Sequence, residues 1–415
     1  MWDKETFIDI NLMAFHQLAN LDQWKGIVCC YRPKDSEVGL FGFGAQDFID
    51  LKSGLPVELL DIIMGSGKYW MGYLNYDLKN KVENLDSRNP HPMGFSDAFF
   101  FVPQLLLRFS EEGGLEEVYN SSGISWQKYM VFFDKKNDGK PRTWTPLQSK
   151  EKYIESVEKL KYHIQRGDIY EINFCQAFET DWHGADGWSV FSKVFEATEA
   201  PYSAYLRHGH RHICCGSPEL FLKKYDNVLV SSPIKGTIRR GKEKKEDDEL
   251  KEQLYNDPKE RAENVMIVDL VRNDMSRIAD DDSVWVDELW ALHTFKTVHH
   301  LISRISCEIQ EAVTFSDIVK AMFPMGSMTG APKVNAMKFA DELEAVSRGV
   351  YSGSIGIVRP DSSFEFNVVI RALLLDEHLK KAMVHVGGAI TDMCDPEKEY
   401  EETLLKGRAL MNMEF

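Results

Sequence analysis

The run FEFNVVIRALLL at residues 364–375 is followed, after five residues, by a second apolar run, KAMVHVGGAI at 381–390. Both are typical of β-strands. Further strand-like runs lie at 283–289, 300–309 and 353–360, and helical patterns do not alternate regularly with them. A doubly wound parallel fold needs that alternation, so the chain is predicted to have an α+β fold.

Three helices are predicted around these strands. Apolar residues spaced i, i+3, i+4 and i+7 after Ser149 predict a helix that ends near Gly167. A second, long helix is expected over about 243–276, and a last one over about 396–412, where Pro396 suits the first turn.

The domain organisation follows from composition. Residues 1–145 form a β-rich N-terminal region and residues 146–415 a second region, which we expect to be intergrown with it as one structural unit. The segment at 135–150 is polar, contains Gly and two Pro, and is the best candidate for a linker.

Charge and cysteine content restrict the function. The 415 residues include 49 Lys+Arg and 65 Asp+Glu, for a net charge of −16, which argues against a polyanionic partner such as nucleic acid. No apolar run is long enough to span a membrane, and the N-terminus lacks a secretion signal. The seven Cys lack the spacing of zinc sites, so we expect them to be reduced core residues in a cytoplasmic protein.

Two pairs of carboxylates have the spacing that places both members on one helical face. Glu260 and Glu263 are three residues apart, as are Glu399 and Glu402, and Lys406 lies one turn beyond Glu402. Four such acids could hold Mg²⁺, which prefers oxygen ligands. Spacing alone favours two solvated helical faces, because both predicted helices are rich in charged residues throughout.

Two further segments contain candidate reactive groups. Lys235 lies between Pro233-Ile234 and Gly236, where desolvation could make it a nucleophile or a base, although a surface turn lysine is the commoner occurrence. The Gly-rich run at 325–333 contains Ser327 and Thr329 and could present amides and hydroxyls to an anion. It is not a phosphate-binding Walker loop.

Three other positions are chemically distinctive. Arg371 is a charged residue in an apolar run that is predicted to be one strand, so it needs a carboxylate partner from the protein or a substrate. The amides of Gly387 and Gly388 could meet a carboxylate, or the two glycines could form a bulge. His300 precedes a strand, and a lone histidine is more often structural.

Taken together, these segments resemble the chorismate-utilising enzymes, which include the anthranilate, aminodeoxychorismate, isochorismate and salicylate synthases. The resemblance is strong over 151–415 and weak before that. Ten short motifs carry it in order: GDIYEINFCQ (167–176), SPELFL (217–222), SPIKGTIRRG (232–241), KERAENVMIVDLVRND (259–274), VHHLISRI (298–305), FPMGSMTGAPK (323–333), RGVYSGSIG (348–356), FNVVIRAL (366–373), VGGAI (386–390) and DPEKEYEETLLK (395–406).

The resemblance implies a fold and a set of site residues. The fold would be two antiparallel β-sheets packed as a sandwich with helices on the outside. Mg²⁺ would be bound directly by Glu263 and Glu402, with Glu260 and Glu399 in support, and would hold the ring carboxylate of chorismate. The other implied residues are Arg371, Tyr351 and the amides near Gly387 and Gly388 for the enolpyruvyl carboxylate, Ser327 and Thr329 in the loop, His300 near the C4 substituent, Glu219 as general acid, and Lys406 in the metal-site helix.

One position indicates the branch. Where the anthranilate branch typically reads P-I-A-G-T, this chain reads P-I-K-G-T, like the aminodeoxychorismate branch of 4-aminobenzoate and folate synthesis. The resemblance implies that Lys235 attacks C2 of the ring as the C4 hydroxyl leaves, and that ammonia then adds at C4 and expels the lysine. Because the attacking amine must be neutral, we expect a lowered pKa for Lys235.

Glu171 bears on the identity of the nucleophile, and the absence of an amidotransferase motif bears on the source of ammonia. Isochorismate and salicylate synthases carry a lysine where this chain has Glu171, which argues against water as the nucleophile. No amidotransferase motif is visible, so ammonia would come from a separate glutamine amidotransferase subunit. The alternatives are anthranilate synthase component I and, in another class, a non-catalytic chorismate-binding paralogue.

Overall fold

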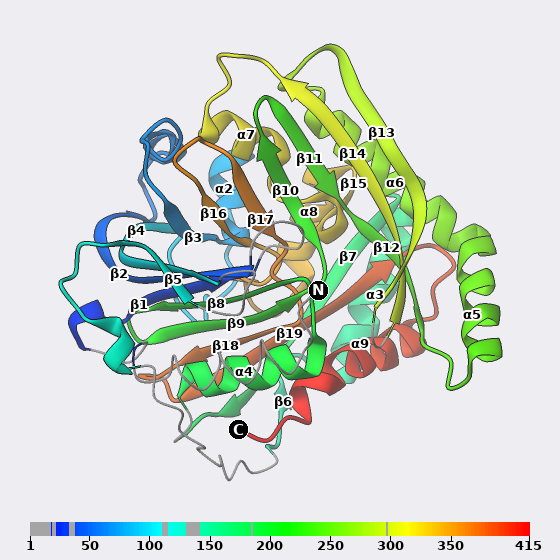
Figure 1. Ribbon diagram of the computed structural model, residues 1–415. Coiled ribbons are helices and arrows are strands. Elements are labelled where there is room, and N and C mark those ends of the chain that lie inside the picture. The colour runs from blue at the N-terminus through cyan, green and yellow to red at the C-terminus, as the bar shows by residue number, and fades with distance from the viewer. Residues whose placement is uncertain are drawn as a thin grey trace.

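The computed structural model describes Leu18 and residues 22–32, 38–109, 115–129, 142–183, 186–295 and 298–415. Throughout these residues the strands pair in antiparallel fashion. They form one continuous hydrogen-bonded sheet that is folded into two layers (Figure 1).

The first layer follows the order β6, β7, β19, β18, β9, β8 and β1, and the short β15 (Gly330–Ala331) also pairs with β7. The bounds in that order are Thr145–Pro146, Glu171–Asp181, Lys381–Ile390, Ala372–Asp376, Arg211–Ser217, Tyr202–His208 and Ile27–Tyr31. Pairing of β1 with β2 continues the sheet into the second layer.

The second layer follows the order β2, β4, β3, β16, β17, β10, β11, β14 and β13, with β5 also beside β4 and β12 also beside β14. The bounds of these eleven strands, in that order, are Val38–Leu51, Ala98–Phe109, Trp70–Leu74, Ser354–Val358, Phe364–Asn367, Leu220–Tyr225, Val228–Ser232, Val298–Ile309, Ala279–Thr294, Leu115–Asn120 and Ile234–Arg239.

The core confirms the predicted sandwich. One cluster of buried side chains draws on both layers, with Tyr31 and Leu374 from the first and Phe99, Phe101 and Ile355 from the second. Burial of such aliphatic and aromatic surface is the main force that holds the layers together. The layers are joined by β1 and β2 rather than being separate sheets, and the α+β class is as predicted.

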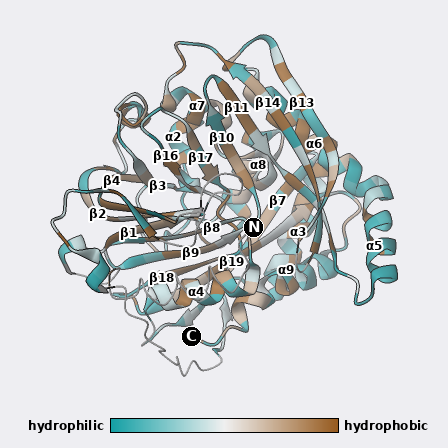
Figure 2. Cartoon of the chain, in the orientation of Figure 1, coloured by the Kyte–Doolittle hydropathy of each residue, from teal (hydrophilic) through white to brown (hydrophobic). Residues whose placement is uncertain are grey.

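The helices lie on the periphery, as expected (Figure 1). The α-helices are α2 (Lys79–Val82), α3 (Lys150–Gln165), α4 (Gly187–Thr198), α5 (Lys244–Asn256), α6 (Pro258–Met275), α7 (Phe315–Met322), α8 (Lys333–Leu343) and α9 (Pro396–Met411). Short 3₁₀ helices are η1 (Asp22–Trp24), η2 (Val57–Ile62), η3 (Tyr76–Leu78), η4 (Trp126–Tyr129) and η5 (Gly326–Met328). Figure 2 shows that α5 is largely hydrophilic, in keeping with its charge-rich sequence.

The predicted first and last helices are confirmed as α3 and α9, whereas the long helix over 243–276 is wrong. The chain forms α5 and α6 there, which are broken at Asp257. Pro258 has no N–H to donate and disfavours helical geometry at the preceding residue, so Asp257 takes an extended conformation. Its carboxylate accepts hydrogen bonds from the amides of Lys259 and Glu260 and caps α6.

The predicted single strand over 364–375 is also interrupted. It forms β17 and β18, and Arg371 lies in the break with φ +51°. A left-handed conformation is unfavourable for a residue with a side chain and does not continue a strand. Arg371 therefore lies outside the strands, contrary to the prediction.

Pairing crosses the boundary predicted at residue 145. β1 pairs with β8, and β3 pairs with β16. In the predicted linker, residues 135–141 lie outside the described residues, and Thr145 and Pro146 form β6 against β7. Residues 130–134, which follow η4, also lie outside the described residues.

All seven cysteines are free and buried, as predicted. In the described part of the chain, no helix has both the length and the apolar character needed to cross a membrane.

Candidate active site

A β-bulge places Lys235 outside the regular strand ladder. In the pairing of β12 with β14, Ile234 lies opposite Ile302 and Thr237 opposite His300, so β12 has one extra residue there. Gly236 has φ +100°, which glycine tolerates and other residues rarely adopt. A hydrogen bond also holds the main chain at this position, because Asn264 Nδ2 donates to the Lys235 carbonyl at 3.2 Å.

The Lys235 side chain is 15% exposed and lies between two carboxylates. Its Nζ is 2.5 Å from Glu171 Oε1 and 3.4 Å from Glu263 Oε2. Burial disfavours the charged amine, but the two glutamates outweigh burial and raise the pKa of Lys235. The expected lowered pKa is therefore wrong for this structure, because the prediction did not include Glu171 and Glu263 as ion-pair partners.

Glu219 lies near Lys235, between the end of β9 and the start of β10. It is 4% exposed and accepts a hydrogen bond from Ser327 Oγ at 2.6 Å. Burial raises its pKa to about 7, against the lowering effects of Ser327, the Ile234 amide and the Lys235 charge. A carboxyl group with this pKa can donate a proton near neutral pH.

His300 and Arg371 lie within electrostatic reach of each other. Burial, together with the nearby Arg371 charge, lowers the pKa of His300 to about 3, so the imidazole is neutral. Its Nδ1 is 2.7 Å from Thr237 Oγ1. The Arg371 guanidinium makes no hydrogen bond or ion pair with the described residues, and burial lowers its pKa. A half-buried cation of this kind is suited to an anionic ligand.

The remaining predicted substrate residues differ in the contacts that they already make within the protein. Tyr351 stacks on His385, with ring centroids 5.2 Å apart. The Thr329 hydroxyl lies 3.2 Å from the carbonyls of Met325 and Gly326 and donates within its own loop. Gly387 and Gly388 are not a bulge: they pair in register with Cys175 and Phe174 of β7.

The two pairs of glutamates approach one another at the N-terminal ends of α6 and α9. Lys259 lies within electrostatic reach of all four, and its Nζ is 3.7 Å from Glu263 Oε1. Burial and the neighbouring acid raise the pKa of Glu260 and of Glu399. Lys406 pairs with Glu402 at 2.7 Å and donates to the Gly387 carbonyl at 3.2 Å.

This donor set fits a divalent cation in its chemistry. Four carboxylates face three lysines, Lys235, Lys259 and Lys406, and Lys235 is shared with Glu171, so excess negative charge remains. Oxygen ligands of this kind suit Mg²⁺. They do not form a ready-made coordination shell: no group of three or more His, Cys, Asp or Glu side chains in the described residues is placed to hold a metal ion.

Sequence reasoning missed two residues of this region. Lys259 precedes Glu260 and lies four residues before Glu263, a spacing that predicts an ion pair on one helical face. Arg348 lies in the motif RGVYSG, but no local signal showed that its side chain would be buried among main-chain carbonyls.

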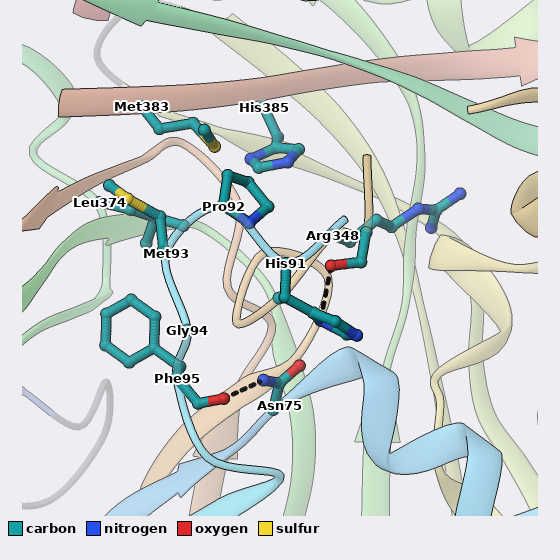
Figure 3. Close-up of a pocket in the computed structure, with 12 residues that line it drawn as sticks. Asn75, His91, Pro92, Met93, Gly94, Phe95, Arg348, Leu374, Met383 and His385 are labelled. Carbon is teal, nitrogen blue, oxygen red and sulfur yellow. Dashed lines mark hydrogen bonds between the residues drawn. The ribbon is translucent and has the colours of Figure 1, made fainter. Parts of the chain in front are cut away.

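A small cavity lies beside Arg348, which is one of the residues that line it (Figure 3). Its volume is about 10 Å³, enough for roughly one water molecule. His385 and Met383 line one side, and His91, which lies 2.8 Å from Ser347 Oγ, lines another. None of the predicted site residues lines it, and it is too small for an organic substrate.

Comparison with known families defines the class of protein. The model of the chorismate binding enzyme family matches residues 50–412. Because this match covers most of the chain, the chain belongs to that family, as the motifs predicted.

Within this family the chain is similar both to aminodeoxychorismate synthases and to an anthranilate synthase. Aminodeoxychorismate synthase component 1 of Escherichia coli is 32% identical, over 89% of this chain and 82% of its own. The chloroplastic aminodeoxychorismate synthase of Arabidopsis thaliana is 35% identical over 83% of this chain, but the match spans only 40% of that longer protein. Anthranilate synthase component 1 of Synechocystis is 37% identical over 66% of this chain and 55% of its own.

A solved structure supports the fold. The crystal structure of anthranilate synthase component I from Streptococcus pneumoniae has a TM-score of 0.80 and 24% identity, covering 91% of this chain and 92% of its own. At that identity the likeness concerns the fold.

Proposed function

We propose that this chain is the chorismate-converting component of an aminodeoxychorismate synthase, which forms 4-amino-4-deoxychorismate from chorismate and ammonia. The observation that carries the proposal is the largely buried Lys235 amine, which a bulge holds beside Glu171 and Glu263. The similarity to aminodeoxychorismate synthase component 1 of Escherichia coli supports it.

The substrate would be oriented by cations and by Mg²⁺. Arg371, without a protein partner in the described residues, would take one carboxylate of chorismate, and Tyr351 would lie beside it. Glu263 and Glu402 would hold Mg²⁺, with Glu260 and Glu399 in support. When bound, the ion would supply positive charge for the second carboxylate.

The chemistry would divide one substitution into two steps. Lys235 attacks C2 of the ring while Glu219 gives a proton to the departing C4 hydroxyl. His300, which is neutral and within electrostatic reach of Arg371, would lie near the C4 substituent. Lys235 is charged in this structure and must first lose a proton, which Glu171 at 2.5 Å is placed to take. Ammonia then adds at C4 and expels the lysine.

We further propose that the ammonia comes from a separate glutamine amidotransferase subunit. The designation of the Escherichia coli relative as a component 1 supports a second component. An ammonium salt would replace that partner in the test.

The test is product identification. The chain is incubated with chorismate, Mg²⁺ and an ammonium salt, and products are identified by chromatography and mass spectrometry. We expect 4-amino-4-deoxychorismate and its loss in Lys235→Ala, whereas Lys245→Ala, at an exposed position on α5, should keep the activity. Release of anthranilate and pyruvate, or full activity of Lys235→Ala, would contradict the proposal. Failure to bind chorismate would favour a non-catalytic paralogue.

A further inference from the structure

Arg348 is a fully enclosed cation that no step above uses. It is 1% exposed and lies in the turn between α8 and β16. Its Nη2 is 2.6 Å from Glu344 Oε1 and its Nε 2.9 Å from Glu344 Oε2, a bidentate pair. The pair neutralises the charge and leaves other guanidinium hydrogens free to reach main-chain acceptors.

Those acceptors lie in two separate segments of the candidate site. Nη1 donates to the Met328 carbonyl at 2.7 Å, and Nη2 donates to the Asn173 carbonyl, also at 2.7 Å. Met328 follows Ser327, whose hydroxyl binds Glu219. Asn173 is two residues beyond Glu171, whose carboxylate binds Lys235. The Arg348 guanidinium therefore bridges two segments of the site. One is the loop whose Ser327 binds Glu219, and the other is strand β7, whose Glu171 binds the Lys235 amine.

Three other contacts fix the orientation of this bridge. Glu344 Oε1 also accepts the Cys175 amide at 3.0 Å, so the carboxylate is itself tied to β7. The guanidinium lies over the Tyr76 ring, 4.5 Å from its centroid. The Asn173 amide donates to the Thr329 carbonyl at 2.8 Å and joins the same two segments directly.

We propose that Arg348 is a positioning residue that keeps Ser327 against Glu219 and Glu171 against Lys235 in one arrangement. The inference rests on the proposed function for the roles of Glu219 and Lys235. A lysine cannot replace the arginine, because a single ammonium cannot reach two carbonyls and both oxygens of a carboxylate in this planar geometry. Loss of the bridge lets the loop and the strand shift apart, and the reaction slows even where the chain stays folded.

Arg348→Lys tests the proposal, with Arg207→Lys as the matched control. Arg207 also binds a carboxylate, Glu377 at 3.2 Å, and a main-chain carbonyl, that of Gly209 at 3.0 Å, but it lies in the β8–β9 hairpin away from the site residues. We expect kcat to fall at least about tenfold in Arg348→Lys with KM for chorismate within about threefold, since misalignment affects the transition state more than binding. Arg207→Lys should match the unchanged protein.

A pH profile separates positioning from a loss of stability. The Ser327 hydroxyl lowers the pKa of Glu219, and Lys235 is the charged group that faces Glu219 in the described residues. Without a properly placed Ser327, the alkaline limb of kcat should move up by about 0.5–1 pH unit, the effect of one hydrogen bond. Ser327→Ala gives the reference shift, and Arg348→Lys should reproduce it.

Either of two results would overturn the proposed positioning role of Arg348. A folded Arg348→Lys with unchanged kcat and an unmoved alkaline limb would overturn it. If Arg348→Lys does not fold, Glu344→Gln weakens the same bridge more mildly, and an unmoved limb in that variant would overturn it equally. Rates are followed as chorismate consumption, which does not depend on the product formed. Anthranilate as the product would therefore contradict the proposed function, while the rates of the variants could still be compared.

Discussion

At the scale of single residues, the candidate site combines two groups whose environments disfavour their ordinary charge states. Glu219 is a buried carboxyl with a pKa raised to about 7, and Arg371 is a half-buried guanidinium without an ion-pair partner in the described residues. Neither arrangement serves stability, because burying a charge costs free energy unless it is paired. Both are what a site for an anionic substrate with a departing hydroxyl requires.

For Glu219, stability and activity should change in opposite directions. Its pKa in the folded chain is about 7 against 4.5 in the unfolded chain, so folding is unaffected below about pH 4.5, and the penalty on folding grows between pH 4.5 and 7 and is complete above about 7. Glu219→Gln removes this penalty, and the free energy of unfolding at pH 8 should rise by up to about 3 kcal/mol. Denaturant titration at pH 4.5 and pH 8 measures it. An equal change at both values would contradict the prediction, and turnover should be lost.

For Arg371, we expect that a substitution leaves stability unchanged or higher while it weakens substrate binding. Arg371→Met removes a half-buried, unpaired charge whose desolvation is unfavourable, so the melting temperature without substrate should stay the same or rise. Chorismate binding should weaken at least about tenfold, because a charge-assisted contact with a carboxylate is lost. Calorimetric titration with chorismate and a thermal melt provide the two measurements. A lower melting temperature with unchanged affinity would show that Arg371 is structural.

At the scale of elements, a Pro at the start of α6 and another at the start of α9 help to build the metal-site candidate. Asp257 and Asp395 cap these helices, with Pro258 and Pro396 at the first helical positions. The caps fix where each helix begins and thus which face presents its pair of glutamates. Spacing predicted the shared faces, but not that the two helices would bring them together.

Lys259 should compete with a cation for these four carboxylates. Lys259→Met removes a charge that interacts with all four of them, so Mg²⁺ should bind more tightly. Isothermal titration with Mg²⁺ measures the change, which we expect to be severalfold. Lys245→Met, at a side chain 88% exposed on α5, is the control. Equal affinities in both variants would argue against the glutamates as the Mg²⁺ ligands.

At the scale of the whole molecule, strand pairing makes the N-terminal and C-terminal regions mutually dependent. β1 and β3 pair with β8 and β16, and the buried cluster between the layers takes side chains from both regions. Thermal unfolding should therefore occur in one transition. Differential scanning calorimetry checks this, and two resolved transitions would indicate regions that fold independently.

The sequence by itself determined the class of fold, the family and the identities of the candidate site residues. Periodicity and short motifs are local, and they identify Lys235, Glu219 and both glutamate pairs without coordinates. It misjudged features that depend on neighbours distant in the chain. The charge on Lys235 depends on Glu171, 64 residues away, and the break at Arg371 cannot be read from an apolar run.

Only the tertiary structure decided how these residues act on one another. A pKa depends on burial and on charges nearby in space, and a bridge such as Arg348 depends on two loops and a strand meeting around one guanidinium. Such contacts join residues from 20 to 175 positions apart, so no local pattern contains them. The sequence therefore named the chemical groups, and the folded sheet set their distances and protonation.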